Sequence, residues 1–192
     1  MVRLVAADAA LMDAALAGDA ALAAALGHPV VPGWVTFTEA LVPTRNALAA
    51  DPSRAAWGTR LFLSGEPPEL VGWGGFKGPP DEGFVEIGYE IAAARRRQGL
   101  ASAAVAAMLA EAFADARVKG VLAHTRPERN PSNHLLENAG FVHAGEIEEQ
   151  GELAWRFILG RPAEPETPRA GPAGSTRGRA APACARGRRH SP

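Results

Sequence analysis

The fold is decided by residues 84–101, which read FVEIGYEIAAARRRQGLA. The first eight residues of this stretch alternate between two faces, as a strand does. From Gly99 to about Ala116, apolar side chains recur at helical spacing. The loop between them reads Arg96-x-x-Gly99-x-Ala101. The first N–H groups of a helix have no intrahelical partner and carry partial positive charge, so such a start attracts anions. The stretch therefore predicts a strand, a phosphate-binding loop and a helix, in that order.

Three consecutive arginines, Arg95, Arg96 and Arg97, carry guanidinium groups that can bind phosphates lying farther from the helix start. The loop is not a P-loop, because no Gly-Lys-Ser/Thr follows, and it is not a dinucleotide fingerprint, because G-x-G-x-x-G is absent. Taken alone, the pattern also fits an ordinary helix start with solvated arginines. The choice between these two interpretations needs the rest of the chain.

Alternating strands and short helices are expected on both sides of this stretch. Turn residues such as Gly65-Glu66-Pro67-Pro68 separate the strands, and Asp8, Thr36 and Gly140 mark helix ends. The predicted strands are 2–6, 59–64, 70–77, 84–91, 120–125, 141–147 and 153–159, and the predicted helices are one capped by Asp8, one ending near Gly27, one opened by Thr36 and kinked or divided by Pro43, 99–116, and 132–138.

Two motifs resemble the GNAT superfamily of N-acetyltransferases, the first its acetyl-CoA signature and the second its downstream half. The first is residues 84–91 followed by Arg96-x-x-Gly99-x-Ala101, and the second is residues 127–141, PERNPSNHLLENAGF. The pattern is similar to the ribosomal-protein N-acetyltransferase branch. The resemblance covers a domain of residues 1–160. It implies an α/β (α+β) fold, with a mixed, mostly antiparallel sheet splayed between strands 4 and 5 and helices on both faces.

Residues 161–192 are rich in Pro, Ala, Gly and Arg and have almost no large apolar side chain. Such a segment cannot bury enough surface to offset its ordering entropy, so it is predicted to be a disordered tail.

The resemblance implies where acetyl-CoA binds. The pantetheine would lie in the splayed cleft, and nearby backbone groups would pair with its amides and polarise the thioester carbonyl. The pyrophosphate would sit on the N–H groups at the start of the helix. Arg129 stands where relatives often carry a CoA-facing asparagine, so a local shift is needed for Asn130 to replace it. The implied cofactor-binding residues are Ile91, Ala92, Arg96, Arg97, Gln98, Gly99, Leu100, Ala101, Ser102 and Asn130.

Acetylation of an amine needs a base, because an alkylammonium group has a pKa of about 10.4 and only the neutral amine is a nucleophile. Glu86 is the first candidate, since it resembles the strand-four glutamate that acts as base in some family members. Glu90 lies on the same face and is the reserve. Either glutamate is also explained as an ordinary solvated strand residue.

The thiolate leaving group benefits from an acid. The tyrosine that many family members supply is replaced here by Leu136, and the only tyrosine of the chain is Tyr89. Ser132 matches a serine of the ribosomal-protein branch, so its hydroxyl is a candidate donor to the sulfur. Ser132 is equally well explained as a helix N-cap.

Composition excludes several other classes. Residues 161–192 contain seven arginines and two glutamates, a charge of about +5. Since the net charge of the chain is −1, residues 1–160 carry about −6. A negative domain disfavours nucleic acid as a partner. The only cysteine is Cys184, which suits a reducing cytoplasm. The sequence contains no run of about 18 apolar residues, so no membrane span is expected.

The histidines, His124 among them, show no metal spacing, and His124 is interpreted as a core histidine. Trp34 is a candidate for lining an acceptor groove or for the core.

We therefore predict a cytoplasmic acetyltransferase, with acetyl-CoA as co-substrate and no metal, acting on a primary amine by direct attack. The sequence does not identify the amine, and it fits a monomer or a homodimer. The alternative is an acyl-CoA-binding sensor without turnover, which the missing tyrosine and the displaced asparagine favour.

Overall fold

The computed structural model describes residues 1–149 and 151–162, and the predicted tail from 163 onward lies outside the described residues. In this part of the chain seven strands form one sheet in the order β1-β2-β3-β4-β5-β7-β6, and only the β4–β5 pair is parallel. The elements are β1 (Arg3–Ala6), α1 (Ala9–Ala17), α2 (Asp19–Leu26), η1 (Thr38–Ala40), α3 (Leu41–Ala50), η2 (Pro52–Trp57), β2 (Thr59–Ser64), β3 (Glu69–Phe76), β4 (Phe84–Ile91), η3 (Ala93–Arg95), α4 (Leu100–Ala114), β5 (Gly120–Thr125), α5 (Pro131–Asn138), β6 (Val142–Glu149) and β7 (Glu152–Gly160).

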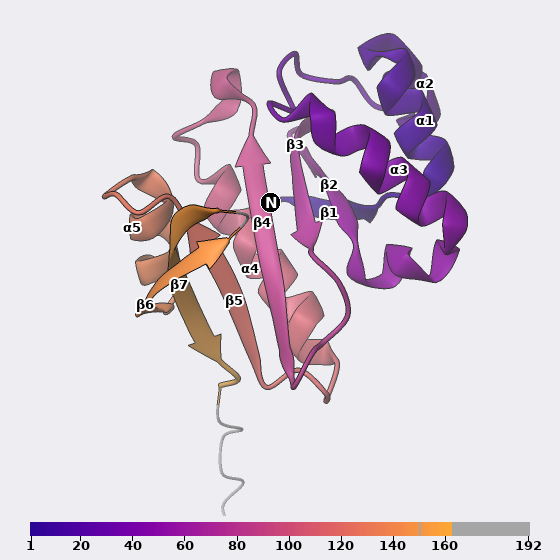
Figure 1. Ribbon diagram of the computed structural model, residues 1–192. Helices are drawn as coiled ribbons and strands as arrows, with labels where there is room; N and C mark the ends of the chain where they lie inside the picture. The colour runs from indigo at the N-terminus through magenta and orange to yellow at the C-terminus, as the bar shows by residue number, and fades with distance from the viewer. Residues whose placement is uncertain (150, 163–192) are drawn as a thin grey trace, which may run out of the picture. The chain divides into compact units, whose positions relative to one another are not determined.

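Helices cover both faces of the sheet, as predicted (Figure 1). The alanine-rich helix α4 packs through Ala104, Val105 and Met108 on the face that carries Val85 and Ile87 of β4. On the opposite face α1, α2 and α3 form a second cluster with side chains of β2 and β3, among them Met12, Leu22, Leu48, Leu61 and Leu70. No helix among residues 1–149 and 151–162 has the length and apolarity that a membrane crossing requires.

The sheet splits between its two parallel strands. β4 and β5 pair only from Phe84↔Gly120 to Ile87↔Ala123, although β4 continues to Ile91. On its other side β4 stays paired with β3 up to Gly72↔Ile91. The second half of β4 therefore has one open edge, which confirms the predicted splay.

The direction of the backbone groups on this edge follows from the ladder to β3. The N–H of Lys77 donates to the carbonyl of Glu86, and the N–H of Ala92 donates to the carbonyl of Val71. Hydrogen-bonding groups alternate along an antiparallel strand, so the even-numbered residues of β4 face β3. The N–H groups of Tyr89 and Ile91 consequently point to the open side, where β5 has separated.

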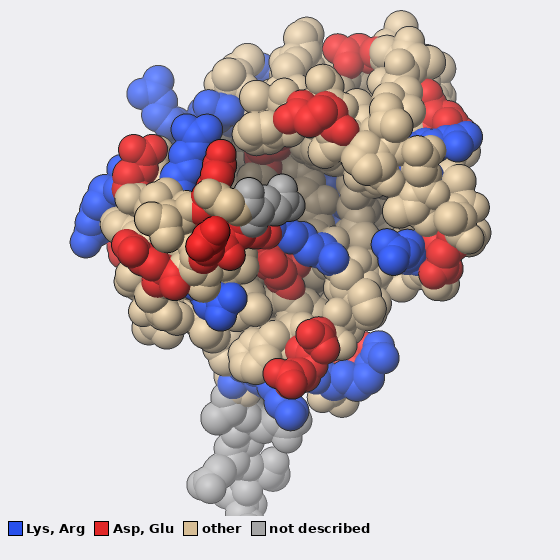
Figure 2. All heavy atoms as spheres, viewed as in Figure 1, with Lys and Arg blue, Asp and Glu red and all other residues tan. Residues whose placement is uncertain are grey.

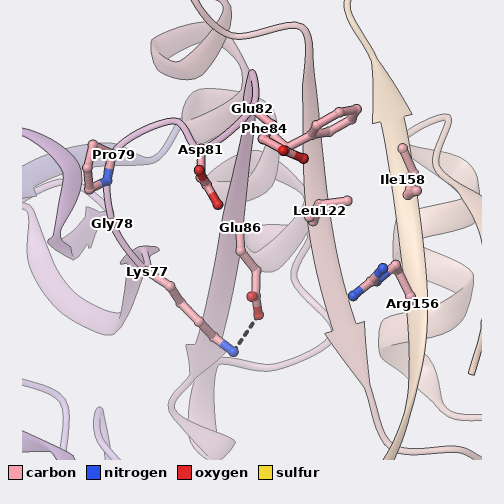
Figure 3. A pocket seen from close by; sticks show the side chains of 10 residues that line it. All are labelled: Lys77, Gly78, Pro79, Asp81, Glu82, Phe84, Glu86, Leu122, Arg156 and Ile158. Atoms are coloured by element: carbon pink, nitrogen blue, oxygen red, sulfur yellow. Dashed lines mark ion pairs between the residues drawn. The ribbon is translucent and has the colours of Figure 1, made fainter. Parts of the chain in front are cut away.

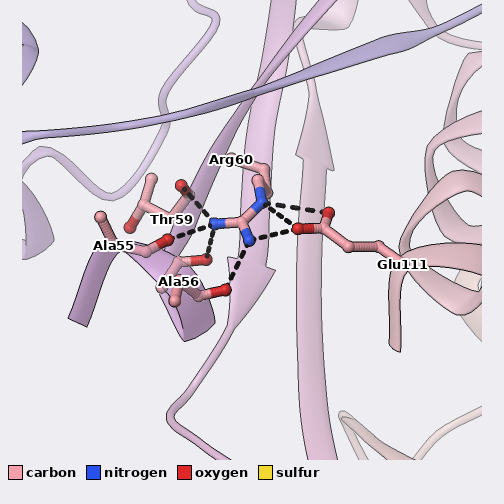
Figure 4. Close-up of polar contacts among 6 residues, drawn as sticks. Ala55, Ala56, Thr59, Arg60 and Glu111 are labelled. Carbon is pink, nitrogen blue, oxygen red and sulfur yellow. Dashed lines mark hydrogen bonds and ion pairs between the residues drawn. The ribbon is translucent and has the colours of Figure 1, made fainter. Parts of the chain in front are cut away.

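A buried arginine joins α4 to the sheet (Figure 4). Arg60 of β2 is 3% exposed, and its guanidinium donates to both carboxylate oxygens of Glu111 on α4. Its remaining N–H groups bind carbonyls around η2, including those of Ala55 (2.8 Å) and Ala56 (2.7 Å). The charge is thus paired and fully hydrogen-bonded, which a buried guanidinium requires.

Arg161, predicted as the first residue of the tail, binds the end of α4. Its guanidinium donates to the carbonyls of Phe113, Asp115 and Val118 at 2.7, 2.5 and 2.8 Å. A cation suits the negative end of a helix dipole. The ordered domain therefore continues through Arg161.

Candidate active site

The loop before α4 forms a row of free amides. Arg97 and Gly99 both have positive φ, 61° and 75°, and Gly99 is the N-cap of α4 without a side-chain capping bond. Among the described residues, the N–H groups of residues 97–102 have no hydrogen-bond acceptor. Successive amides in a loop of this kind form a concave anion-binding nest at the positive end of a helix. The geometry fits the predicted pyrophosphate site.

The three arginines of this loop have different partners. The Arg95 guanidinium donates to Glu69 at 2.5 Å, and this hydrogen bond raises the pKa of Arg95. Arg96 donates through Nε to the carbonyl of Ile91 at 3.0 Å. Arg97 and Gln98 are exposed beside the free amides. Two of the three guanidinium groups thus stabilise the loop itself.

The backbone of Ala92, predicted to contact pantetheine, is already used within the protein. Its N–H donates to Val71 and its carbonyl accepts from the N–H of Arg95, both at 2.8 Å. Ile91 keeps its N–H toward the open edge of β4. The backbone donors available to pantetheine are therefore those of Ile91 and Tyr89.

Asn130, the other predicted contact outside the loop, caps α5. Its side-chain oxygen accepts from the N–H groups of Ser132 (2.9 Å) and Asn133 (3.2 Å), and Asn133 reaches back to the N–H of Asn130 (2.7 Å). The Nδ2 of Asn130 donates to the carbonyl of Glu128. The interpretation of Ser132 as N-cap is therefore wrong, because Asn130 fills that position. Pro131 at the first helical position is the sequence signal that indicated it.

Tyr89 lies next to Ser132. The Tyr89 hydroxyl is buried and makes no hydrogen bond with any described residue. Burial raises the pKa of Tyr89, and the nearby Ser132 hydroxyl opposes this shift. Two hydroxyl groups, one from β4 and one from the first turn of α5, therefore meet on the α4 side of the split. In the sequence Tyr89 is only the single tyrosine of the chain, and no local signal pairs it with Ser132.

Glu86, the predicted base, lies on the other face in a charged cluster. The Lys77 ammonium forms an ion pair with Glu86 (Figure 3) and another with Glu149 at 3.1 Å. His124 Nδ1 lies 3.0 Å from Glu86 Oε1 and 3.4 Å from Glu149 Oε2. The neighbouring strands β4 and β5 thus bring Glu86 and His124 together, and the β6–β7 hairpin adds Glu149.

His124 has 10% of its side chain exposed and lies in this charged cluster, outside the hydrophobic core, so the prediction of a core histidine is wrong. The histidines show no metal spacing along the chain, yet single ligand atoms of Glu86, His124 and Glu149 lie within 4.8 Å of one another. Sequence spacing missed this group because its members stand on three different strands. The cation that stands beside the two carboxylates in the structure is the Lys77 ammonium.

Glu90, the reserve base, holds the segment between α2 and η1 in place. Its Oε1 accepts from the indole N–H of Trp73 and, at 2.9 Å, from the N–H of Thr36. Trp34 is 2% exposed, packs edge-on against Trp73 at 5.9 Å between centroids and donates to Asp19. Trp34 belongs to the core, and the prediction that it lines a groove is wrong.

A pocket of about 430 Å³ opens beside the charged cluster (Figure 3). It extends from the β3–β4 loop to β7, and Lys77, Glu86 and Arg156 line the side next to His124. Figure 2 shows the surface hollowed between the β6–β7 hairpin and the α1–α3 lobe, with acidic side chains around the hairpin. The open face of the sheet therefore offers space and negative charge next to Glu86.

Comparisons with known proteins agree with this geometry. An uncharacterized N-acetyltransferase of Bacillus subtilis (strain 168), YjdG, is 29% identical over 143 residues, which are 73% of this chain and 85% of that protein. A GnaT-family acetyltransferase of Bordetella pertussis has 20% identity and a TM-score of 0.59, covering 82% of this chain and 94% of that one. RimJ of Mycobacterium smegmatis, solved with CoA-disulfide, has 20% identity and a TM-score of 0.56, covering 83% and 81%.

Residues 1–142 match the model of the acetyltransferase (GNAT) domain family. That match spans well over half of the chain and includes the loop, the split edge of β4 and the cap of α5. The chain belongs to the GNAT family and is an acetyl-CoA-dependent acetyltransferase.

Proposed function

We propose that this protein transfers an acetyl group from acetyl-CoA directly to a primary amine within a ternary complex. Transfer to amines is general in the family. The observation that carries the proposal is the row of free amides at residues 97–102, which follows directly on the open edge of β4. One end of a CoA molecule needs an anion site, and the other end needs extended backbone donors.

On this proposal the diphosphate binds the amides of residues 97–102, with Arg97 and Gln98 beside it. The pantetheine lies along the open edge of β4, where Tyr89 and Ile91 present their N–H groups. A donor fixed at the thioester carbonyl stabilises the charge that develops there during attack. Holding the thioester and the amine together supplies much of the rate enhancement.

Because side chains alternate along β4, the base and the acid lie on opposite faces of the sheet. Glu86 faces away from α4, and on that face it takes a proton from the amine directly or through water. The nitrogen forms a C–N bond to the acetyl carbon and the C–S bond breaks. The Ser132 hydroxyl gives its proton to the thiolate and regains one from the acetylated nitrogen, directly or through water. Direct attack is proposed because residues 1–162 contain no cysteine that could carry the acetyl group.

Two observations favour the alternative, an acyl-CoA sensor without turnover. Lys77 already neutralises Glu86, and Asn130 is committed to its cap. A sensor needs the CoA site but no free base.

Release of free CoA thiol distinguishes the two. The full-length chain is incubated with acetyl-CoA and a panel of primary amines, and binding of acetyl-CoA alone is measured by calorimetry. The proposal predicts binding together with amine-dependent thiol release. Binding without release across the panel would establish the sensor.

A further inference from the structure

Five elements bring charged or titratable groups to one place on the open face of the sheet. Lys77 follows β3, Glu86 is on β4, His124 on β5, Glu149 at the end of β6 and Arg156 on β7. These five strands are consecutive in the sheet, in the order β3-β4-β5-β7-β6, so the cluster forms only in the folded domain. Lys77 pairs with both carboxylates, whereas Arg156 contacts His124.

The hydrogen bond from Arg156 fixes the state of the histidine. Arg156 Nε donates to His124 Nε2 at 3.3 Å, so that nitrogen is the acceptor and the neutral ring carries its proton on Nδ1. His124 Nδ1 is turned toward Glu86 and Glu149 but aligns with neither as a hydrogen bond, and it has no partner among the described residues. Nine-tenths of the His124 side chain is buried. The proton on Nδ1 faces the two carboxylates, so His124 adds a donor to the cluster and the negative charge of the cluster comes from Glu86 and Glu149 alone.

Lys77 is the member of the cluster that is able to leave. Its backbone N–H is fixed by Glu86 O at 3.0 Å, but its side chain is 51% exposed and carries the ammonium on a flexible four-carbon stem. Burial alone would lower the pKa of Lys77, but the ion pairs with Glu86 and Glu149 outweigh it and raise that pKa. Lys77 therefore enters the cluster as an alkylammonium ion.

The position of the cluster matches that of an acceptor. Glu86 is one residue before Ile87, the last residue of β4 that pairs with β5. The pocket beside it is lined by Lys77, Glu86 and Arg156. A ligand that fills this pocket brings its own ammonium group to the same carboxylates. A divalent metal ion is disfavoured there, because Lys77 and Arg156 already place positive charge against the three potential ligands.

We propose that Glu86 and Glu149 form the seat of the acceptor's ammonium group, and that Lys77 occupies this seat until the acceptor displaces it. The inference rests on the proposed function and names its substrate class: an aliphatic primary amine that is protonated at neutral pH. After the exchange, one proton passes from the acceptor ammonium to Glu86 and the neutral nitrogen attacks the thioester. Arylamines and alcohols, which bring no cation, do not displace Lys77.

The test compares Lys77→Met, which removes the ammonium but keeps an unbranched stem, with Lys77→Arg, which keeps a cation. Binding of n-butylammonium to the full-length, CoA-saturated protein is measured by calorimetry, with tetramethylammonium at equal ionic strength and 1-butanol as controls. An internal occupant that fills the seat nine-tenths of the time weakens ligand binding about tenfold. Lys77→Met is therefore expected to bind n-butylammonium about tenfold tighter than the wild type, and neither Lys77→Arg nor the control ligands show this gain.

Adding Glu149→Gln to Lys77→Met is expected to abolish the gain, because one of the two carboxylates is lost. Equal n-butylammonium affinity in wild type and a folded Lys77→Met variant would overturn the proposal. CoA binding is recorded on the same samples. A chain that keeps CoA but shows no gain refutes only the ammonium seat, whereas a wild type that does not bind CoA refutes the proposed function.

Discussion

Glu86 carries the most specific mechanistic claim at the scale of single residues. With Glu86→Gln the enzyme must rely on the fraction of amine that is already neutral in solution, and this fraction falls tenfold per pH unit below a pKa of about 10.4. We expect a loss of about 10²–10⁴-fold in kcat/KM that is greatest at low pH. The pH–rate profile of the variant checks this. A profile parallel to that of the wild type would remove Glu86 from the mechanism.

Ser132 and Asn130 separate a chemical role from a capping role. Asn130→Ala removes the cap of α5 and is expected to cost about 1 kcal/mol of unfolding free energy. Ser132→Ala leaves that cap intact, so its cost should stay within about 0.5 kcal/mol, while kcat falls because the thiolate loses its proton donor. Denaturant unfolding and steady-state kinetics on both variants test this. A Ser132→Ala enzyme with an unchanged kcat would make the hydroxyl irrelevant to the leaving group.

The conformation of the candidate phosphate loop could be predicted because its residues stand within a short stretch. The loop at residues 97–101 follows from glycine, arginine and helical periodicity, and it has the geometry expected. The cap was assigned to Ser132 although Asn130-Pro131 carried the better signal. The proximity of Tyr89 to Ser132 could not be foreseen, because the two residues are far apart in sequence and stand on β4 and α5.

The elements themselves were predicted well where alternation or helical periodicity was strong, as in β4 and α4. Their arrangement was not contained in local patterns. Lys77, Glu86, His124 and Glu149 are far apart in sequence and meet only because β4 lies beside β5 and the β6–β7 hairpin brings Glu149 to them. A spacing rule within one segment cannot find such a cluster.

The junction between α4 and β2 depends on Arg60 and Glu111. Glu111→Ala leaves the guanidinium of Arg60, 3% exposed, without its carboxylate partner. Hydrogen bonds to charged groups contribute about 1.5–3 kcal/mol, so we expect a destabilisation of about 2 kcal/mol. Glu128→Ala, a change at an exposed glutamate, is the control and should stay near zero. Equal unfolding free energies for the two variants would show that Arg60 does not need this ion pair.

The end of α4 carries a pH-dependent contribution. The hydrogen bond from the Arg117 side chain is the main cause that lowers the pKa of Asp115 to about 2, and Arg161 contributes to the lowering. The folded-state pKa is lower than the unfolded value of about 3.9, so the stabilisation is present above pH 4 and is lost as the pH falls toward 2. The difference in unfolding free energy between wild type and Asp115→Asn should therefore be constant near neutrality and shrink below pH 4. A difference that is independent of pH from 6 to 2 would contradict this.

At the scale of the whole domain, the split sheet separates the residues proposed to act on the leaving group from those proposed to act on the acceptor. Tyr89 and Ser132 lie with α4 and α5, while Glu86 and Glu90 lie on the face of α1–α3. The proposed thioester position is the gap between β4 and β5, which is open to both faces. The acidic character of residues 1–160 and the glutamates around the hairpin (Figure 2) suit a cationic acceptor.

Binding of CoA by the loop amides is the central claim. Calorimetric titration of acetyl-CoA into three chains tests it directly. Gly99 and Gly33 share a φ of 75°, and an added Cβ meets no atom within 4 Å at either position, so Gly33→Val matches Gly99→Val in local strain. We predict that the wild type and Gly33→Val bind acetyl-CoA with affinities within about twofold of each other, and that Gly99→Val binds at least about tenfold more weakly, a loss of about 1.4 kcal/mol. A wild type that does not bind acetyl-CoA, or a Gly99→Val variant that binds it as tightly as the wild type, would contradict the account.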